Sequence, residues 1–333
     1  MNRHDLVLAA MICGAMATLT ACSAPGAGDG GVDETYLTSI DELAPRSPAA
    51  GEKLRVAVTT SILADIVGRV GGEHIELVSL IPVGVDPHAF EPTPGDARTL
   101  AEADIIFVNG FGLEAFMADL IQQAGGGAPV VSVSEGIAPL PFEGEAHEDG
   151  DPGRDEHAAD PHLWLDPNNV IQWTDNIEAA LQAVDPARAD DYAAQAEATR
   201  GELNALDREI REIVAGIPPE NRILVTDHDE LAYFADEYDF TLVGTVIPGA
   251  SSLAEPSAAQ LAELLDQVRA LRVPAVFVSS VVHPGLVETF AADAGIQVAT
   301  LYAHSLTGPD GPAPNYVDLM RYNAETIAAA LVP

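Results

Sequence analysis

Cysteine and basic residues are both scarce in this chain. Its 333 residues include two cysteines, Cys13 and Cys22. We expect Cys13 to leave with an N-terminal signal, so that the mature chain keeps Cys22 alone and forms neither an internal disulfide nor a cysteine metal site. Lys and Arg number 15 against 52 Asp and Glu, which gives a formal net charge of −37. Because phosphate backbones are bound mainly by Lys and Arg, we expect no nucleic-acid partner.

The remaining composition is that of a globular protein. Hydrophobic residues make up 47% of the chain and the mean hydropathy is +0.13, which is enough for a packed core. The length allows one large domain or two of ordinary size. The acidic charge fits a protein that attracts cations. A solvated acidic surface without further meaning is the simpler alternative.

Residues 1–21 have the pattern of a secretory signal. Arg3 gives a basic start, and an apolar stretch runs from Leu6 to Leu19. It is shorter than the roughly 20 residues that a membrane span needs, which argues against a permanent anchor. The stretch ends in Leu19-Thr20-Ala21-Cys22. This resembles a bacterial lipobox, in which cleavage precedes the cysteine and lipid is attached to it. We therefore predict a lipoprotein, acylated at Cys22 and held at the outer side of the cell membrane.

The rest of the chain divides into a tether and two lobes. Residues 22–53 are rich in small and polar residues and are expected to form a flexible, lipidated tether. From Leu54 onward, strand-like and helix-like stretches alternate, which is typical of an α/β fold with a parallel sheet and covering helices. The first set, in the N-terminal lobe (54–185), has strands at Leu54–Thr60, Ile75–Ile81, Asp104–Asn109 and Pro129–Val133 and helices at Ser61–Val70, with Ser61 as N-cap, and Gly112–Ala124. The second set, in the C-terminal lobe (218–333), has strands at Ile223–Thr226, Phe240–Ile247, Ala275–Ser279 and Gln297–Tyr302 and helices at Glu230–Tyr238, Ser257–Leu271, Gly285–Ala294 and Tyr316–Leu331.

One long helix is expected between the lobes, over residues 186–217. Few helix breakers occur there, and apolar residues recur at spacings of three and four. They are Leu203, Leu206, Ile210, Ile213 and Ile217. A helix of roughly 30 residues spans about 45 Å, which is long enough to run along both lobes and connect them.

An acidic segment, residues 142–161, interrupts the N-terminal lobe. It contains Gly, many carboxylates, His147 and His157, and almost no apolar side chain. Such a segment buries too little to order itself, so we interpret it as a mobile insertion. His147 and His157 either collect metal as an auxiliary site or belong to a solvated loop, and the sequence favours neither.

Four histidines follow buried strands or the loops after them. They are His88, His162, His228 and His304. In an open parallel sheet, the carboxyl ends of the strands line the ligand-binding crevice. One such histidine is more often simply hydrogen-bonded than bound to metal, but four at equivalent positions predict a metal site. His283 is interpreted as a surface turn residue, and His74 lies at the start of a strand, the wrong end of the sheet.

The type of ligand favours zinc. Zn²⁺ prefers nitrogen and sulfur ligands, whereas Mn²⁺ and Mg²⁺ prefer oxygen, so an all-imidazole set points to zinc, with copper or nickel next. Each ligating histidine also needs a partner for its second ring nitrogen, usually a carboxylate or carbonyl. Nearby candidates, each of which is more simply explained by capping or turn formation, are Asp86, Asp160, Asp166, Asp227 and Asp229.

Several motifs carry a family resemblance. The most specific are Pro87-His88-Ala89-Phe90-Glu91-Pro92-Thr93-Pro94 and Asp160-Pro161-His162-Leu163-Trp164-Leu165-Asp166-Pro167, supported by Glu255-Pro256-Ser257 and Met320-Arg321-Tyr322-Asn323. Over residues 54–333 the chain resembles the metal-binding receptors of bacterial ABC importers that take up zinc and manganese. The resemblance implies two lobes, each with a four-stranded parallel sheet and flanking helices, joined by one long rigid helix, with metal in the cleft between them.

The resemblance also implies the ligands. His88, His162 and His228 fall on the first three ligand positions of the family. At the third position manganese receptors usually carry Glu and zinc receptors His, so His228 favours zinc, as does the acidic loop. The fourth position is commonly Asp but is His304 here, so that either a fourth imidazole binds the ion or water fills the place. A second departure is Ser279-Ser280, where many relatives have Glu after the strand.

The main functional hypothesis is a lipid-anchored extracytoplasmic receptor that captures Zn²⁺ and delivers it to an ABC permease and its ATPase, acting as a monomer. Four protein ligands close the coordination shell, which suits binding rather than hydrolysis. One alternative is a zinc hydrolase with three histidines and a metal-bound water, with Glu255 or Asp229 as general base. Another is an adhesin or structural lipoprotein that the metal only stabilises. Mn²⁺, Cu²⁺ and Ni²⁺ remain alternative metals.

Overall fold

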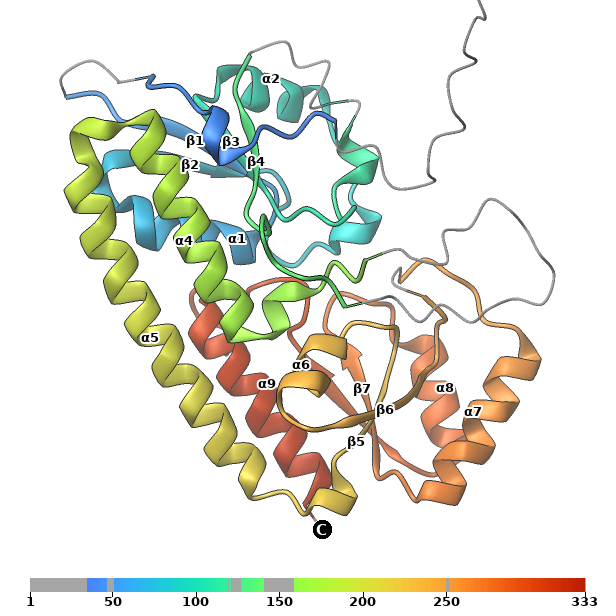
Figure 1. The fold of residues 1–333 in the computed structure, drawn as a ribbon. Helices are drawn as coiled ribbons and strands as arrows, with labels where there is room; N and C mark the ends of the chain where they lie inside the picture. Colours follow the sequence, from blue (N-terminus) through green and yellow to red (C-terminus); the bar gives the residue numbers. More distant parts are fainter. Residues whose placement is uncertain are drawn as a thin grey trace, which may run out of the picture.

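The structure is a computed structural model, and it describes residues 35–46, 51–118, 120, 127–140, 159–249 and 252–332. Two lobes are stacked along one long helix (Figure 1). The predicted signal, the predicted lipidation site Cys22 and the two histidines of the acidic loop, His147 and His157, lie outside the described residues. No helix among the described residues is both long enough and apolar enough to cross a membrane.

The N-terminal lobe is built on a four-stranded sheet in which every strand is parallel to its neighbours. Its strands are β1 (Leu54–Val58), β2 (Ile75–Ser79), β3 (Ile105–Val108) and β4 (Val130–Ser132), in the order β2-β1-β3-β4. Every residue of β3 is buried. A central parallel strand covered on both faces reads as a continuous apolar run, which is why Ile105–Val108 was recognisable from the sequence.

Helices α1 (Ser61–Gly71), α2 (Pro94–Glu102) and α4 (Pro167–Val184) belong to this lobe. The expected N-cap of α1 was wrong by one residue, because Thr60 caps the helix by accepting the backbone N–H of Leu63, and Ser61 is the first helical residue. No residue range was predicted for α4, but the interpretation of Asp166 as a helix cap is confirmed, because Asp166 caps the helix and Pro167 starts it. Within the predicted helix Gly112–Ala124, the described residues include a 3-10 helix at Ala115–Met117.

The C-terminal lobe repeats the architecture of the first. Its strands are β5 (Ile223–Thr226), β6 (Thr241–Thr245), β7 (Ala275–Ser279) and β8 (Gln297–Leu301), all parallel and in the order β6-β5-β7-β8. Its helices are α6 (Ala232–Glu237), α7 (Ala258–Leu271), α8 (Gly285–Ala294) and α9 (Tyr316–Leu331). The expected fold class, two lobes with four-stranded parallel sheets, is therefore confirmed.

Helix α5 (Ala189–Ala215) joins the two lobes. It has 27 residues, so it extends about 40 Å at 1.5 Å per residue. It packs against α1 and α4 of the first lobe and α9 of the second. Its apolar stripe is buried at Leu203, Leu206 and Ile210, within one core cluster that continues through both lobes. Figure 1 shows the helix running along the side of the whole molecule.

Residues 35–46 lie against the N-terminal lobe, although the sequence analysis placed them in the flexible tether. The backbone N–H of Thr38 donates to the carbonyl of Val130 at 2.7 Å, and that of Arg46 donates to Val184 at 2.8 Å. Ile40 and Leu43 pack on the main core cluster. Residues 35–46 are therefore hydrogen-bonded to the edge strand β4 and to α4.

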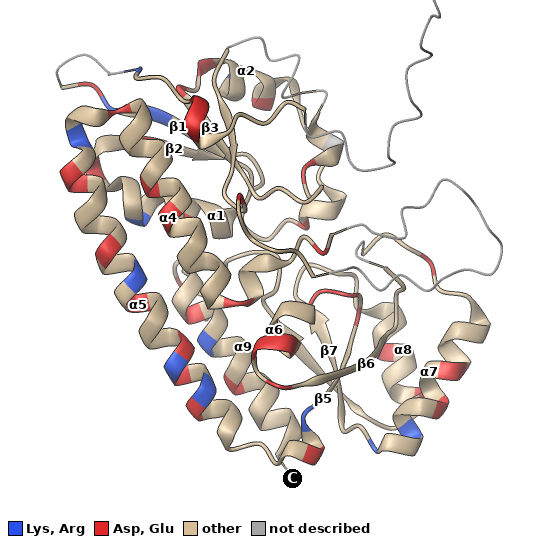
Figure 2. Cartoon of the chain, viewed as in Figure 1, with Lys and Arg blue, Asp and Glu red and all other residues tan. Residues whose placement is uncertain are grey.

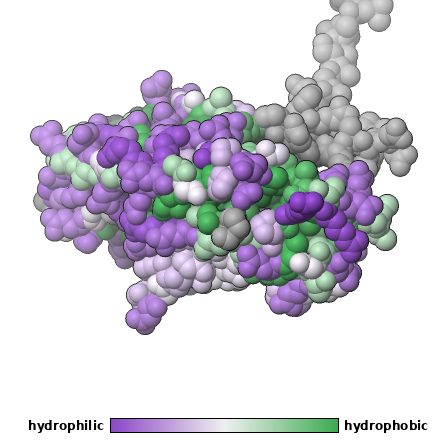
Figure 3. Space-filling view, turned by 90° about the horizontal axis from the view of Figure 1, so that it is seen from below, coloured by the Kyte–Doolittle hydropathy of each residue, from purple (hydrophilic) through white to green (hydrophobic). Residues whose placement is uncertain are grey.

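The surface is predominantly acidic and polar. Asp and Glu are distributed over both lobes, and several Lys or Arg positions lie along α5 between them (Figure 2). Arg200 contacts Asp175 and Glu178, and Arg321 contacts Glu209. At the end of the molecule formed by the C-terminal lobe, hydrophilic residues surround a smaller apolar area (Figure 3).

Candidate metal centre

The four predicted histidines come from two loops of each lobe. His88 is in the 3-10 helix Pro87–Ala89 after β2, and His162 precedes the 3-10 helix Leu163–Leu165. His228 follows β5, and His304 follows β8. All four loops leave the lobes at the faces that oppose each other, so residues far apart in the chain meet between the two sheets.

The ring nitrogens of these histidines converge on one point. One nitrogen from each of the four lies within 4.8 Å of the other three. Nε2 of His88 and Nε2 of His162 are 3.2 Å apart. Two nitrogens bound tetrahedrally to one Zn²⁺ at about 2.0–2.1 Å lie roughly 3.4 Å apart, so this spacing suits a pair of ligands of one ion. The ring centroids are between 4.9 and 5.8 Å apart.

Two of the imidazole rings have a carboxylate oxygen at Nδ1. Nδ1 of His162 lies 2.8 Å from Oδ1 of Asp160, and Nδ1 of His228 lies 2.8 Å from Oδ1 of Asp227. The same two oxygens accept the backbone N–H groups of the histidines. Because a carboxylate only accepts, Nδ1 carries the proton and the lone pair of Nε2 remains for a metal. Asp160 and Asp227 therefore orient the histidine rings as well as forming turns, and turn formation alone was the simpler interpretation of each.

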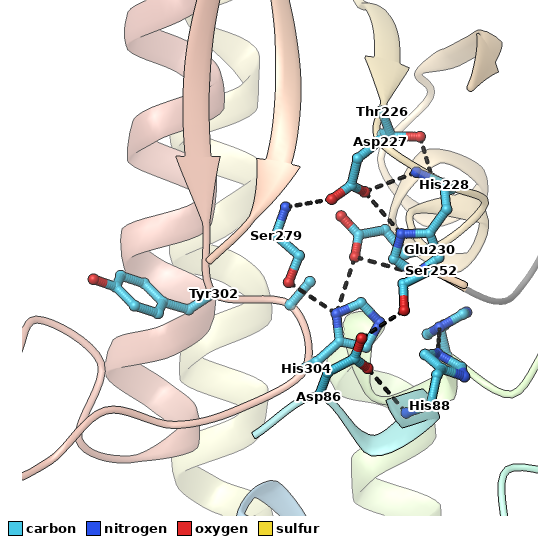
Figure 4. A network of polar contacts seen from close by, with 12 residues as sticks. Asp86, His88, Thr226, Asp227, His228, Glu230, Ser252, Ser279, Tyr302 and His304 are labelled. Atoms are coloured by element: carbon cyan, nitrogen blue, oxygen red, sulfur yellow. Dashed lines mark hydrogen bonds and ion pairs between the residues drawn. The ribbon is translucent and has the colours of Figure 1, made fainter. Parts of the chain in front are cut away.

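His304 is held by a serine and a glutamate. Its Nδ1 lies 2.9 Å from Oγ of Ser279 and 3.3 Å from Oε2 of Glu230 (Figure 4). The backbone N–H of Ser279 donates to Oδ2 of Asp227 at 2.8 Å. Ser279 therefore links Asp227, which contacts His228, to His304. The sequence alone gave no physical reason for a serine at this position.

The other aspartates near the histidines have different partners. Asp86 accepts the backbone N–H of His88 at 2.9 Å, and its second oxygen accepts the hydroxyl of Ser252, which lies in the other lobe, at 2.5 Å. Asp166 accepts the N–H of Asn168 as the cap of α4. Asp229 lines a cavity of about 590 Å³ between α6, β6 and α7, which Asp160 also lines. Asp86 thus joins the two lobes beside the site, and Asp166 caps a helix as the simpler interpretation had it.

Burial favours the neutral imidazole of His88 and of His304. His162 and His228 are fully buried, His304 is 2% exposed and His88 is partly exposed. Burial, followed by repulsion from His162 and His228, lowers the pKa of His88 to about 2. Burial and the three neighbouring imidazoles lower the pKa of His304 well below its usual value. Since metals bind the neutral ring, these shifts favour metal over proton.

Sequence reasoning missed Glu230. It was placed inside a predicted helix from Glu230 to Tyr238, but α6 begins at Ala232 and Glu230 lies in the preceding turn. Its carboxylate is fully buried beside His228 and His304. Burial, with repulsion from Asp227, Asp86 and Asp160, raises its pKa well above the usual value. The available signal was its position two residues after a predicted ligand.

The remaining candidates lie away from the centre. His283 is exposed and accepts the N–H of Gly285, as expected for a turn residue. His74 pairs with Asp191 at the opposite end of the sheet. Glu255 is exposed. Neither Glu255 nor Asp229, the two bases considered for a hydrolase, belongs to the group of converging ligands.

Comparison with known proteins gives one consistent picture. The model of the family described as "ZnuA: Zinc-uptake complex component A periplasmic" matches residues 56–330. The chain is 34% identical over 282 residues to the manganese-binding lipoprotein MntA of Halalkalibacterium halodurans, covering 84% of this chain and 89% of that protein. It is 31% identical over 294 residues to the iron-binding protein YfeA of Yersinia pestis, covering 88% and 91%.

Solved structures agree with the fold. The periplasmic zinc-binding protein TroA from Treponema pallidum superposes with a TM-score of 0.75 at 28% identity, covering 85% of this chain and all of that one. The Mn-bound periplasmic metal-binding protein from Candidatus Liberibacter asiaticus gives a TM-score of 0.74 at 26% identity, covering 84% of this chain and all of that one. The names of these relatives thus include zinc, manganese and iron.

Proposed function

This chain belongs to the zinc-uptake complex component A family, and from that premise we propose that its four histidines capture Zn²⁺ for delivery to an ABC permease. At the level shared by its relatives, the chain is an extracytoplasmic metal-binding receptor of an ABC importer and not an enzyme. The zinc hydrolase considered from the sequence is thereby set aside. The proposal adds which metal is carried and which residues carry it.

The convergence of four imidazoles supports zinc. His88, His162, His228 and His304 each present a nitrogen to the same point, and nitrogen donors suit Zn²⁺ better than Mn²⁺, which prefers carboxylate and water oxygens. In the proposed complex all four histidines are ligands, with His304 in the fourth position in place of water. Mn²⁺ is the second candidate, because MntA and other similar proteins are named for manganese.

The surrounding charges also favour a cation. Asp86, Asp160, Asp227 and Glu230 all lie near the four imidazoles. All four are buried, and buried charges are costly unless an opposite charge is close. A bound dication supplies that charge. The acidic surface of the whole protein further raises the local concentration of cations.

The location and partners follow from the same proposal. Relatives such as MntA are named lipoproteins, which supports acylation of Cys22 and anchoring of this chain at the outer face of the membrane. The partners are the permease and its ATPase, and the receptor acts as a monomer. His147 and His157 form an auxiliary capture site, which is tested by comparing the rate of zinc uptake with that of a variant in which both are alanine.

The decisive experiment is a competition titration of Zn²⁺ against Mn²⁺ on protein freed of metal with a chelator. We expect tight binding of one Zn²⁺ in wild type, much weaker Mn²⁺ binding, and loss of tight Zn²⁺ binding in His88→Ala, which removes one of the converging nitrogens. His283→Ala is the matched control, because His283 is exposed and outside the site. Preferential Mn²⁺ binding, or unchanged affinity in His88→Ala, would contradict the proposal.

The structural-lipoprotein alternative is tested with the same samples. The main core cluster is made of apolar residues from both lobes and from α5, so we expect the metal-free protein to stay folded. Circular dichroism after chelation measures this. Outright unfolding on metal removal would favour a metal that serves only the fold.

A further inference from the structure

We propose that Glu230 is a positioning residue of the metal site, which holds His304 as the fourth ligand by contacting its Nδ1. The inference rests on the proposed function, since it assigns a role at the same site. It adds to the four-histidine hypothesis a carboxyl group that acts through His304. Glu230 also lies with Asp227 and His228 in a second group of side chains close enough together to hold an ion.

The first support is the place of the Glu230 side chain. Oε2 lies 3.3 Å from Nδ1 of His304 and 3.9 Å from Nε2 of His228. Nδ1 of His304 is the nitrogen turned away from the converging point, and its Nε2 has no hydrogen-bond partner among the residues that the structure describes. A carboxylate at Nδ1 keeps the proton there and leaves the lone pair of Nε2 for an ion. Figure 4 shows Glu230 and Ser279 on the same side of the His304 ring.

The second support is that nothing else in the described part of the chain satisfies this carboxylate. Both oxygens of Glu230 are buried without a hydrogen bond among the described residues. A buried carboxylate without donors is costly, because it loses its water without compensation. A side chain that served only packing would be stable here as an apolar residue. A nearby cation and a polarised imidazole N–H are what make an acid favourable at this position.

The third support is the pattern among the histidines. His162 and His228 each have a carboxylate at Nδ1 at 2.8 Å. At His304 the hydrogen bond of Nδ1 is with the hydroxyl of Ser279 at 2.9 Å, and the carboxyl of Glu230 lies beside the same nitrogen at 3.3 Å without a hydrogen bond. Without the carboxyl group of Glu230, Nδ1 of His304 keeps only the hydroxyl of Ser279. The His304 ring is then less firmly held in the orientation that presents Nε2 to an ion.

The test compares four proteins in a double-mutant cycle: wild type, Glu230→Gln, His304→Ala and the double variant. Gln keeps the shape of Glu230, which is fully buried, and replaces its carboxyl group with an amide. Zn²⁺ affinity is measured by competition with a chelating dye. Supporting partners of ligating histidines typically contribute roughly 10–100-fold in affinity, so we expect Glu230→Gln to weaken binding by about that factor. In the His304→Ala background, we expect Glu230→Gln to change affinity far less, because its partner is gone.

A second readout separates positioning from folding. In Co²⁺-loaded protein, we expect Glu230→Gln to alter the visible absorption bands, which report the ligand geometry, while the metal-free protein melts at or above the wild-type temperature. Glu255→Gln is the matched control, since Glu255 is exposed. Unchanged Zn²⁺ affinity in Glu230→Gln, or an equal loss in both backgrounds, would overturn the inference. Failure of wild type to bind Zn²⁺ would instead refute the proposed function.

Discussion

The neutral state of His88 predicts how the metal-free protein responds to acid. In the folded protein its pKa is lowered to about 2, mainly by burial, whereas in the unfolded chain the pKa of a histidine is about 6.5. Below that pH the unfolded state therefore binds a proton that the folded state does not. The free energy of unfolding therefore falls as the pH falls below about 6.5. Above about that pH, His88 no longer lowers it.

The magnitude follows from the distance between the two pKa values. Each pH unit between them changes the free energy of unfolding by about 1.4 kcal/mol, so His88 costs about 2 kcal/mol at about pH 5 relative to about pH 6.5. His304 acts with the same sign because its pKa is also lowered. Glu114 acts with the opposite sign, because burial raises its pKa to about 7. The pH dependence of the free energy of unfolding of wild type is thus a sum of several contributions. The contribution of His88 must therefore be measured as a difference between two proteins.

The comparison is between wild type and His88→Asn, both freed of metal, in urea unfolding from about pH 7.5 to about pH 5. The contributions of Glu114 and His304 are present in both proteins and largely cancel. We expect wild type to lose about 2 kcal/mol more than the variant over this range, from the lowered pKa of His88. Parallel profiles would refute the reasoning, because they would mean that His88 titrates alike in the folded and unfolded states.

Three further predictions concern the site and the core. His228→Ala is expected to abolish tight Zn²⁺ binding in calorimetry, since it removes a fully buried converging nitrogen. Asp227→Ala should weaken Zn²⁺ binding about 10–100-fold in the same assay, because His228 loses its Nδ1 acceptor, and unchanged binding would show that the pair is not needed. Leu206→Ala should lower the free energy of unfolding by about 2–5 kcal/mol while leaving affinity unchanged, since the side chain is buried in the core and outside the site.

Much of the fold was predictable because its signals are local. The runs Ile223–Thr226 and Ala275–Ser279 became β5 and β7 with the predicted bounds. Ser257 caps α7 with a capping box completed by Gln260. The start of helix α4 was also recognisable, because Asp166-Pro167 combines an N-cap with proline at the first helical position. The choice between Thr60 and Ser61 as a cap needed the backbone angles, which the sequence does not carry.

The site was predictable only in part, for a physical reason. The histidines could be found because the ends of parallel strands gather at one edge of a sheet. Their supporting groups depend on how the two lobes face each other and on turn geometry. Glu230 could be taken for the first residue of a helix, yet the turn before α6 directs its carboxylate to His304. Likewise, the bond between Asp86 and Ser252 exists only once both lobes are in place.

The continuity of α5 limits how an ion can enter and leave. A helix without an internal break over Ala189–Ala215 offers no flexible joint, and swinging the lobes wide apart would pull Leu206 and Ile210 out of the core. We therefore expect ion exchange to involve movement of the short loops that carry the histidines more than a hinge motion of the two lobes. On that expectation, the metal-free and metal-loaded proteins have nearly the same overall shape.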